Sequence, residues 1–131
     1  MEFTIPAIPS SVRITGSWKQ SPKASNRAVT RSKYSEIRDI SFTEIGPAAA
    51  WLRMRHPLVA GEEPSPLQRA LIAADVGNGI SSAVDFRRFV FVNVDLTVQL
   101  ERLPEGEWVC VDAVTLPRRR GNATAESVLS D

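Results

Sequence analysis

The longest regular pattern in the chain is an alternation of apolar and polar residues between Val90 and Arg102. Valine or leucine occupies every even position from 90 to 100, and the positions between them are polar except for Phe91. Successive side chains of a β-strand point to opposite faces of a sheet, so this alternation predicts one long strand. We expect its apolar face, Val90 to Leu100, to cover a helix.

A helix is predicted over 65–77, ahead of this strand. Ser65 is a favoured N-cap residue, Pro66 suits the first helical position, and Gln68 completes a capping box with Ser65. Apolar residues then recur at intervals of three and four, which gives the helix one buried face. These residues are Leu67, Ala70, Leu71 and Ala74. The sequence Gly77-Asn78-Gly79 is expected to end the helix because glycine readily adopts the left-handed conformation.

Shorter strand patterns flank these two elements. Two of them, at 37–45 and 48–56, precede the helix, and two more, at 108–116 and 123–129, follow the long strand. Turn sequences rich in proline and glycine separate them. Consecutive strands joined by short turns form antiparallel pairs. The predicted fold class is therefore α+β, with an antiparallel sheet wrapped around one long helix.

Basic charge is concentrated at the start of the chain. Residues 1–34 contain six Lys or Arg residues and one acidic residue, Glu2, whereas 35–131 contains ten basic and fourteen acidic residues. The first segment is also rich in Ser and Thr and shows no sustained helix or strand period. This composition indicates a basic tail or linker over 1–34 and one domain over 35–131. A basic arm for nucleic acid or for a membrane surface is the less favoured alternative.

The single Cys110 and the single His56 restrict the possible chemistry. One cysteine forms no disulfide within the chain, and the pair cannot build a structural zinc site of the usual Cys and His type. We expect no metal and no cofactor. No apolar stretch reaches the length of a membrane span and no signal-peptide pattern is visible, so we expect a soluble cytoplasmic protein with no membrane partner.

Several short sequences within 35–131, in one order, resemble those of a known family. They are Trp51-Leu52-Arg53-Met54-Arg55, the stretch from Pro57 to Arg69, Ala73-Ala74-Asp75, the stretch from Phe91 to Val98, Gly106-Glu107-Trp108-Val109 and Ala125-Glu126-Ser127-Val128-Leu129. Together they are similar to the acyl-CoA thioesterase II type of the thioesterase-like hotdog superfamily. The resemblance implies a single hotdog unit, the second of the two that such chains usually contain.

The resemblance also implies a hydrolytic site. In the family, an Asp on the helix, a Thr or Asn on a strand and a Gln on the final strand position the attacking water. By motif position the first two are Asp75 and Asn93, while the final strand and its Gln have no counterpart before Asp131. The resemblance therefore implies an acyl-CoA thioesterase with an Asp-activated water. The alternative is a non-catalytic, truncated hotdog module that binds or assembles with a partner.

Asp75 and Asn93 can also be judged from their own positions. Asp75 lies one turn after Leu71, on the flank of the apolar stripe and in the last helical turn. Burial and the helix dipole would both disfavour its charged form there, which suits a general base near neutral pH. Its alternative role is to cap the N–H groups of 77–79. Asn93 could hold a water or a thioester oxygen, or could be a polar position on a solvated sheet face.

Two further features concern partners. Arg118, Arg119 and Arg120 occupy a predicted turn and could bind the phosphates of coenzyme A, or could form a solvated basic turn. Without the family's last strand, the strand at 122–130 or its neighbour would have unpaired backbone groups. We therefore expect a homodimer, or a pairing with another hotdog unit, that buries about 1,200–2,000 Å².

Overall fold

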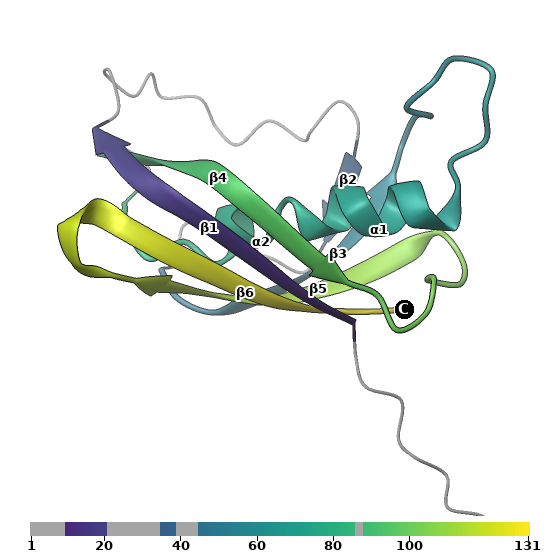
Figure 1. Ribbon diagram of the computed structural model, residues 1–131. Helices are drawn as coiled ribbons and strands as arrows, with labels where there is room; N and C mark the ends of the chain where they lie inside the picture. The colour runs from purple at the N-terminus through teal and green to yellow at the C-terminus, as the bar shows by residue number, and fades with distance from the viewer. Residues whose placement is uncertain (1–9, 21–34, 39–44, 86–87) are drawn as a thin grey trace, which may run out of the picture.

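The computed structural model describes residues 10–20, 35–38, 45–85 and 88–131 (Figure 1). The elements in chain order are β1 (Ser10–Gln20), β2 (Ser35–Arg38), β3 (Ala48–Met54), α1 (Pro66–Ala74), α2 (Gly77–Ile80), β4 (Phe89–Gln99), β5 (Trp108–Pro117), the 3-10 turn η1 (Arg119–Gly121) and β6 (Asn122–Ser130). The strands form one sheet in the order β2-β3-β5-β6-β1-β4, and all neighbouring pairs are antiparallel. Figure 1 shows both helices against one face of this sheet. The predicted α+β class and the antiparallel sheet are confirmed.

The helical region is two short helices, so the prediction of one long helix over 65–77 is wrong. The predicted capping box is present: Gln68 N–H donates to Ser65 Oγ at 3.2 Å, and Ser65 N–H donates to Gln68 Oε1 at 2.8 Å. At the junction of the helices the Val76 N–H donates to the Ala73 carbonyl at 3.3 Å, a bond that spans three residues. The α-helical spacing returns in α2, where the Ile80 N–H donates to the Val76 carbonyl at 3.1 Å. Neither Gly77 nor Gly79 has a positive φ. Both glycines lie within α2, and the interruption between the two helices falls before them, at Asp75 and Val76.

β1 lies inside the sheet, between β6 and β4. Residues 10–17 pair with 122–129 on one side, and residues 11–20 pair with 89–99 on the other. The prediction of a tail therefore fails for 10–20, because pairing with two long neighbours stabilises a strand whose own apolar pattern is short. The rest of the predicted tail, 1–9 and 21–34, lies outside the described residues.

The open edges of the sheet differ from the prediction. β6 pairs with β5 on one side and with β1 on the other, so the expected unpaired edge at 122–130 is wrong. β1 occupies the position beside β6 that was expected to be empty. In the described sheet the outermost strands are β2 and β4. Among the described residues, the long strand β4 therefore has a neighbouring strand on one side only.

A β-bulge interrupts β4 at Val94. Thr15 of β1 pairs with Asp95 and the next residue, Gly16, pairs with Asn93, so Val94 has no counterpart in the ladder. An extra residue of this kind exchanges the two faces of a strand. Side chains before and after Val94 therefore reach the helices from positions of opposite parity.

The bulge explains why β4 lacks the continuous apolar face that its sequence predicts. Phe91 and Val98 pack against the core although they differ in parity. Val90, Val92 and Val94 are 42%, 36% and 74% exposed. The prediction that the valine side covers a helix is therefore wrong for 90–94, where residues 91 and 93 face the helices instead.

The core lies between the two helices and the inner faces of β3, β5 and β6. Its buried members are Ala50, Leu52, Ala73, Ala74, Ile80, Val109, Val111, Ala113, Ala125 and Leu129. Half of these residues are alanine, so the helices can approach the sheet closely. Apart from Leu52, Ile80 and Leu129, the core is built without large side chains.

The helices and the sheet leave no space for a further side-chain atom where Gly77 of α2 contacts Ser127 of β6. A Cβ at position 77 would overlap Ser127 Oγ, and that buried hydroxyl has no hydrogen-bond partner among the described residues. We expect Gly77→Ala to lower the free energy of unfolding by about 1–3 kcal/mol. Ser127→Ala should be neutral or stabilising alone and should restore most of the loss in the double variant. Urea denaturation of the four proteins tests this coupling, and additive effects would contradict it.

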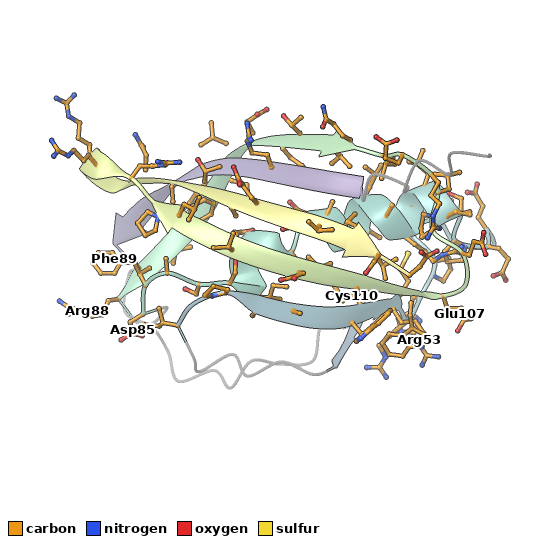
Figure 2. The ribbon with its side chains drawn as sticks, turned by 90° about the horizontal axis from the view of Figure 1, so that it is seen from below. Arg53, Asp85, Arg88, Phe89, Glu107 and Cys110 are labelled. Carbon is orange, nitrogen blue, oxygen red and sulfur yellow. The ribbon has the colours of Figure 1, made fainter. Side chains whose placement is uncertain are left out.

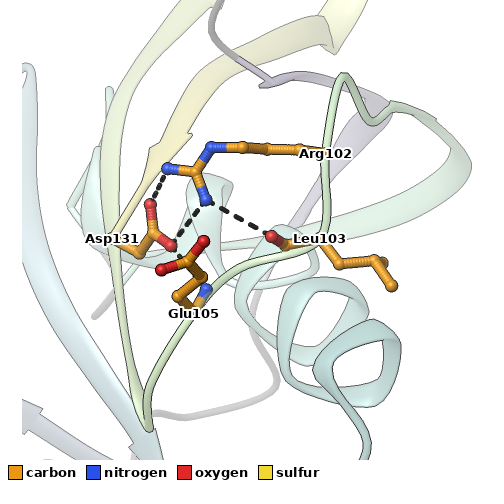
Figure 3. Close-up of polar contacts among 4 residues, drawn as sticks. All are labelled: Arg102, Leu103, Glu105 and Asp131. Atoms are coloured by element: carbon orange, nitrogen blue, oxygen red, sulfur yellow. Dashed lines mark hydrogen bonds and ion pairs between the residues drawn. The ribbon is translucent and has the colours of Figure 1, made fainter.

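A polar cluster ties the end of the described chain to the loop between β4 and β5 (Figure 3). The Asp131 carboxylate accepts hydrogen bonds from Arg102 Nη1 at 2.7 Å, from Arg102 Nη2, and from the backbone N–H of Glu105. Arg102 Nη1 also donates to the Leu103 carbonyl at 3.3 Å. The bond from Arg102, followed by that from the Glu105 N–H, holds the pKa of Asp131 far below its ordinary value.

This cluster predicts a pH dependence of stability. A carboxylate whose pKa is lowered by folding stabilises the protein above its unfolded pKa, about 3.9, and this contribution is lost as the pH falls toward the folded value. We expect Asp131→Asn to lower the melting temperature at pH 7. The difference in melting temperature between this variant and the wild type should become smaller below about pH 4. Thermal unfolding between pH 7 and pH 3 tests this, and a gap that stays constant would contradict it.

Candidate functional site

The two residues that the motif positions imply lie side by side. Asp75 is the C-cap of α1, and Asn93 belongs to the edge strand β4. Asn93 Nδ2 donates a hydrogen bond to Asp75 Oδ1 at 3.0 Å. The bulge at Val94 fixes the face of β4 that Asn93 occupies. The structure therefore joins the helix and the strand through this carboxylate and amide.

The surroundings of Asp75 differ from the prediction. The residue is exposed, and Leu71, one turn earlier, is 42% exposed as well. The expected burial on the flank of an apolar stripe is therefore wrong, because α1 packs on the sheet through the alanines at 70, 73 and 74. In the described part of the chain, no N–H group of 77–79 donates to the carboxylate. The contact with Asn93 thus takes the place of the predicted capping alternative.

An exposed apolar row leads along α1 to the carboxylate. Leu67, Leu71 and Asp75 follow one another at intervals of four residues, and such residues lie on the same side of a helix. Leu67 is 44% exposed. Two leucines that a monomer leaves in water therefore stand in line with Asp75, where an apolar chain or a partner surface can contact them.

The three arginines of the predicted turn lie elsewhere. Arg118 to Arg120 connect β5 to β6, and the Arg118 N–H closes the turn by donating to the Asn122 carbonyl at 2.8 Å. Arg120 adopts φ 64, in the left-handed region. All three are exposed, and no described carboxylate forms an ion pair with them. β1 separates β6 from β4, so the turn does not contact Asp75 or Asn93.

Arg88 and Phe89 form a cation–π contact that no sequence pattern predicted. The Arg88 guanidinium lies over the Phe89 ring, 5.9 Å from its centroid. Figure 2 shows this pair at one end of the sheet, while Arg53 and Glu107 lie at the other end. Phe89 stands just outside the alternation that predicted the strand. The neighbouring arginines in its sequence are the one signal that could have drawn attention to it.

A separate hollow lies on the opposite face of the sheet. It has a volume of about 630 Å³ and crosses β4, β1, β6 and β5. Arg13 and Glu126 form an ion pair in its lining at 3.3 Å, beside Thr97 and Asp112. Asp112 and Glu126 alternate with core residues on β5 and β6, so they point away from the helices. This hollow is not part of the Asp75 and Asn93 site.

Neither a metal-binding cluster nor a membrane-spanning helix is found among the described residues. No three of their His, Cys, Asp or Glu side chains are close enough together to hold a metal ion. Within the same residues, no helix combines the length and the apolar character that crossing a membrane requires.

A match to one protein-family model shows the family of this chain. The family model described as acyl-CoA thioesterase C-terminal domain matches residues 12–131. The chain belongs to this family. The match confirms the resemblance inferred from the short sequences, and it begins within β1, so the family region includes most of the strand that composition alone assigns to a tail. No curated protein and no solved structure matches the chain.

Proposed function

We propose that this member of the acyl-CoA thioesterase C-terminal domain family provides a site that hydrolyses acyl-CoA thioesters. One observation carries the proposal: the 3.0 Å hydrogen bond from Asn93 Nδ2 to Asp75 Oδ1. It fixes one oxygen of a carboxylate that is otherwise open to solvent and substrate. Family membership supports the substrate class.

In the proposed reaction, Asp75 acts as a general base. Its free oxygen accepts a proton from a water whose oxygen attacks the thioester carbonyl carbon. The tetrahedral intermediate then expels the thiolate by breaking the carbon–sulfur bond. The thiolate takes up the proton that Asp75 accepted, which restores the base, and the products are a carboxylic acid and free coenzyme A. Asn93 is a positioning residue, because its Nδ2 orients the base while its Oδ1 can accept a hydrogen bond from the attacking water.

The apolar row on α1 supports an acyl substrate. Leu67 and Leu71 stand in line with the carboxylate and together leave substantial apolar area in water. An acyl chain laid along this side of the helix would bury that area while keeping its thioester near Asp75. The same leucines would be covered in part by a partner.

We also propose that the site is completed by assembly. An exposed carboxylate is a weak base, and covering it with a second hotdog unit would exclude bulk water and strengthen its interactions. β4 supports this arrangement, because it is an outermost strand of the described sheet and exposes Val90, Val92 and Val94. A homodimer, or a complex with another hotdog unit, would cover this edge and the leucines of α1 together.

The competing function is a hotdog module without catalysis. It is favoured by the exposure of Asp75. Thiol release from short-, medium- and long-chain acyl-CoAs by the purified protein separates the two functions. Turnover above the uncatalysed rate supports the thioesterase. Binding of acyl-CoA without turnover at any chain length leaves only the non-catalytic module.

A further inference from the structure

Part of the helix-facing side of β4 is left open to solvent. Leu96 pairs with Ile14 of β1, and the partner of Ile14 on its other side is Ala125, a core residue. Residues directly opposite one another share a face of the sheet, so Leu96 lies on the face that the helices cover. It is nevertheless 37% exposed. The helices therefore do not cover the second half of β4 completely, and a large apolar side chain remains accessible there.

The exposed leucines of α1 lead in the same direction as this part of β4. Asp75 and Asn93 join the two elements by their hydrogen bond. From that contact, Figure 1 shows α1 and β4 extending toward the same end of the molecule, where α1 begins and β4 ends. Leu71 and Leu67 lie on the same side of the helix as Asp75. Apolar side chains of both the helix and the strand therefore lead away from one carboxylate.

The helix and the strand each place two apolar residues at matching distances from the site. A helix rises about 1.5 Å per residue, so Leu71 is about 6 Å and Leu67 about 12 Å along α1 from the carboxylate. On β4 the bulge shortens the path, and the paired residues of β1 measure it. Counted from the partner of Asn93, the partner of Leu96 lies two residues further and that of Val98 four, which is about 7 and 14 Å. Leu71 and Leu96 therefore form a near level of apolar side chains, and Leu67 and Val98 a far level.

Both elements end at the far level. Leu67 is the second residue of α1, directly after the N-cap Ser65 and Pro66. Glu62 and Glu63, which are both exposed, precede that cap. On the other side, β4 ends one residue after the far level, at residue 99. A methylene group placed beyond the far level would therefore meet the polar start of the helix and would gain little from burial.

We propose that Leu67, Leu71, Leu96 and Val98, here called the acyl path, bind the acyl chain and set its preferred length. Both rows start at the carboxylate, where the thioester must lie, which favours an acyl chain over a partner surface as their occupant. An extended alkyl chain advances about 1.3 Å per carbon, because its bonds are about 1.5 Å long and zigzag. The acyl path therefore suits a chain of about ten carbons. The inference rests on the proposed function and makes it more specific, because it assigns the length of the acyl group.

Binding of S-alkyl-coenzyme A thioethers tests the inference without hydrolysis. Isothermal titration of the full chain with alkyl groups of two to sixteen carbons gives the affinity at each length. We expect the affinity to rise about twofold per carbon, as for methylene groups that are partly buried, up to about ten carbons and then to stay constant. An affinity that rises evenly to sixteen carbons would overturn the inference, and so would a lack of binding at every length.

Leucine-to-glutamine variants distinguish the two levels. Leu67→Gln should lower the ratio of ten-carbon to six-carbon affinity about fivefold, whereas Leu71→Gln and Leu96→Gln should lower the ratio of six-carbon to two-carbon affinity about threefold. All three leucines are exposed, and glutamine has a helix propensity close to that of leucine, so the α1 variants should fold. Val128→Gln is the control, because Val128 is 41% exposed on the opposite face of the sheet. It should leave both ratios at their wild-type values, and unchanged ratios in the folded leucine variants would overturn the inference.

The remaining outcomes separate the acyl path from a partner surface and from the proposed function. Leucine variants that dissociate an assembly in sedimentation velocity while both ratios stay unchanged would assign these leucines to a partner and overturn the inference. A wild type that shows the length limit in binding but releases no thiol from any acyl-CoA removes the thioesterase and keeps the acyl path. Hydrolysis and binding that do not depend on chain length, in the wild type and in Leu67→Gln, keep the thioesterase and remove the acyl path.

Discussion

Asp75→Asn should reduce acyl-CoA hydrolysis by about 100-fold or more while changing thermal unfolding little. The substitution keeps the size and shape of the side chain, and its amide oxygen can still accept the hydrogen bond from Asn93. It removes the group that accepts the proton from water. Because Asp75 is exposed, its loss leaves no buried cavity. The rate constant for thiol release and the melting temperature of the two proteins test both parts of this result.

Asp112→Asn is the matched control. Asp112 is an exposed carboxylate on the opposite face of the sheet, so the same change of charge there should leave the rate unaltered. Asn93→Ala should give an intermediate loss, since it releases the carboxylate without removing it. Near-full activity in Asp75→Asn would exclude Asp75 as the base. A similar loss in Asp112→Asn would mean that net charge, and not the site, controls the rate.

Val94→Lys should dissociate the proposed assembly and lower hydrolysis about tenfold or more at micromolar protein. Val94 is 74% exposed and unpaired in the ladder, so the lysine costs the isolated domain little. In a pairing of two β4 edges, however, it would bring a charge into the interface from each copy. Sedimentation velocity and thiol release over a range of protein concentrations test the prediction, and raising the concentration should recover part of the activity.

Val94→Thr is the control for this variant. Threonine keeps the branched shape and the strand preference of valine but adds no charge, so it should retain both assembly and activity. If the wild type sediments as a monomer with full activity, the proposed completion of the site by a partner is wrong. If Val94→Lys remains assembled, the interface lies away from the β4 edge.

The sequence correctly predicts those elements whose capping and turn residues favour the conformation that the fold also requires. The capping box fixes the start of α1, and the turns at 104–106 and 117–122 separate β4, β5 and β6 almost as predicted. The pairing of Asp75 with Asn93 follows from motif position. No local sequence pattern predicts this contact, because Asp75 caps a helix and Asn93 lies on a strand 18 positions later.

The features that the sequence does not predict depend on the rest of the fold. β1 has a weak pattern of its own and is stabilised by two long neighbours, which no local window detects. The bulge at Val94 reverses the faces of β4, although the alternation of residue types continues through it unchanged. Sequence alone therefore predicts Val92 on the helix side of β4, whereas the structure leaves it 36% exposed.

A single-turnover reaction in ¹⁸O-labelled water tests the central claim most directly. The purified protein is mixed with a smaller amount of one acyl-CoA in labelled water. Mass spectrometry then gives the masses of the released acid and of the intact protein. Water activated by Asp75 predicts one ¹⁸O atom in each molecule of acid, no acylated protein, and release that is about 100-fold or more slower with Asp75→Asn. Acid without the label, an acyl group on the protein, or no release by the wild type would contradict the account.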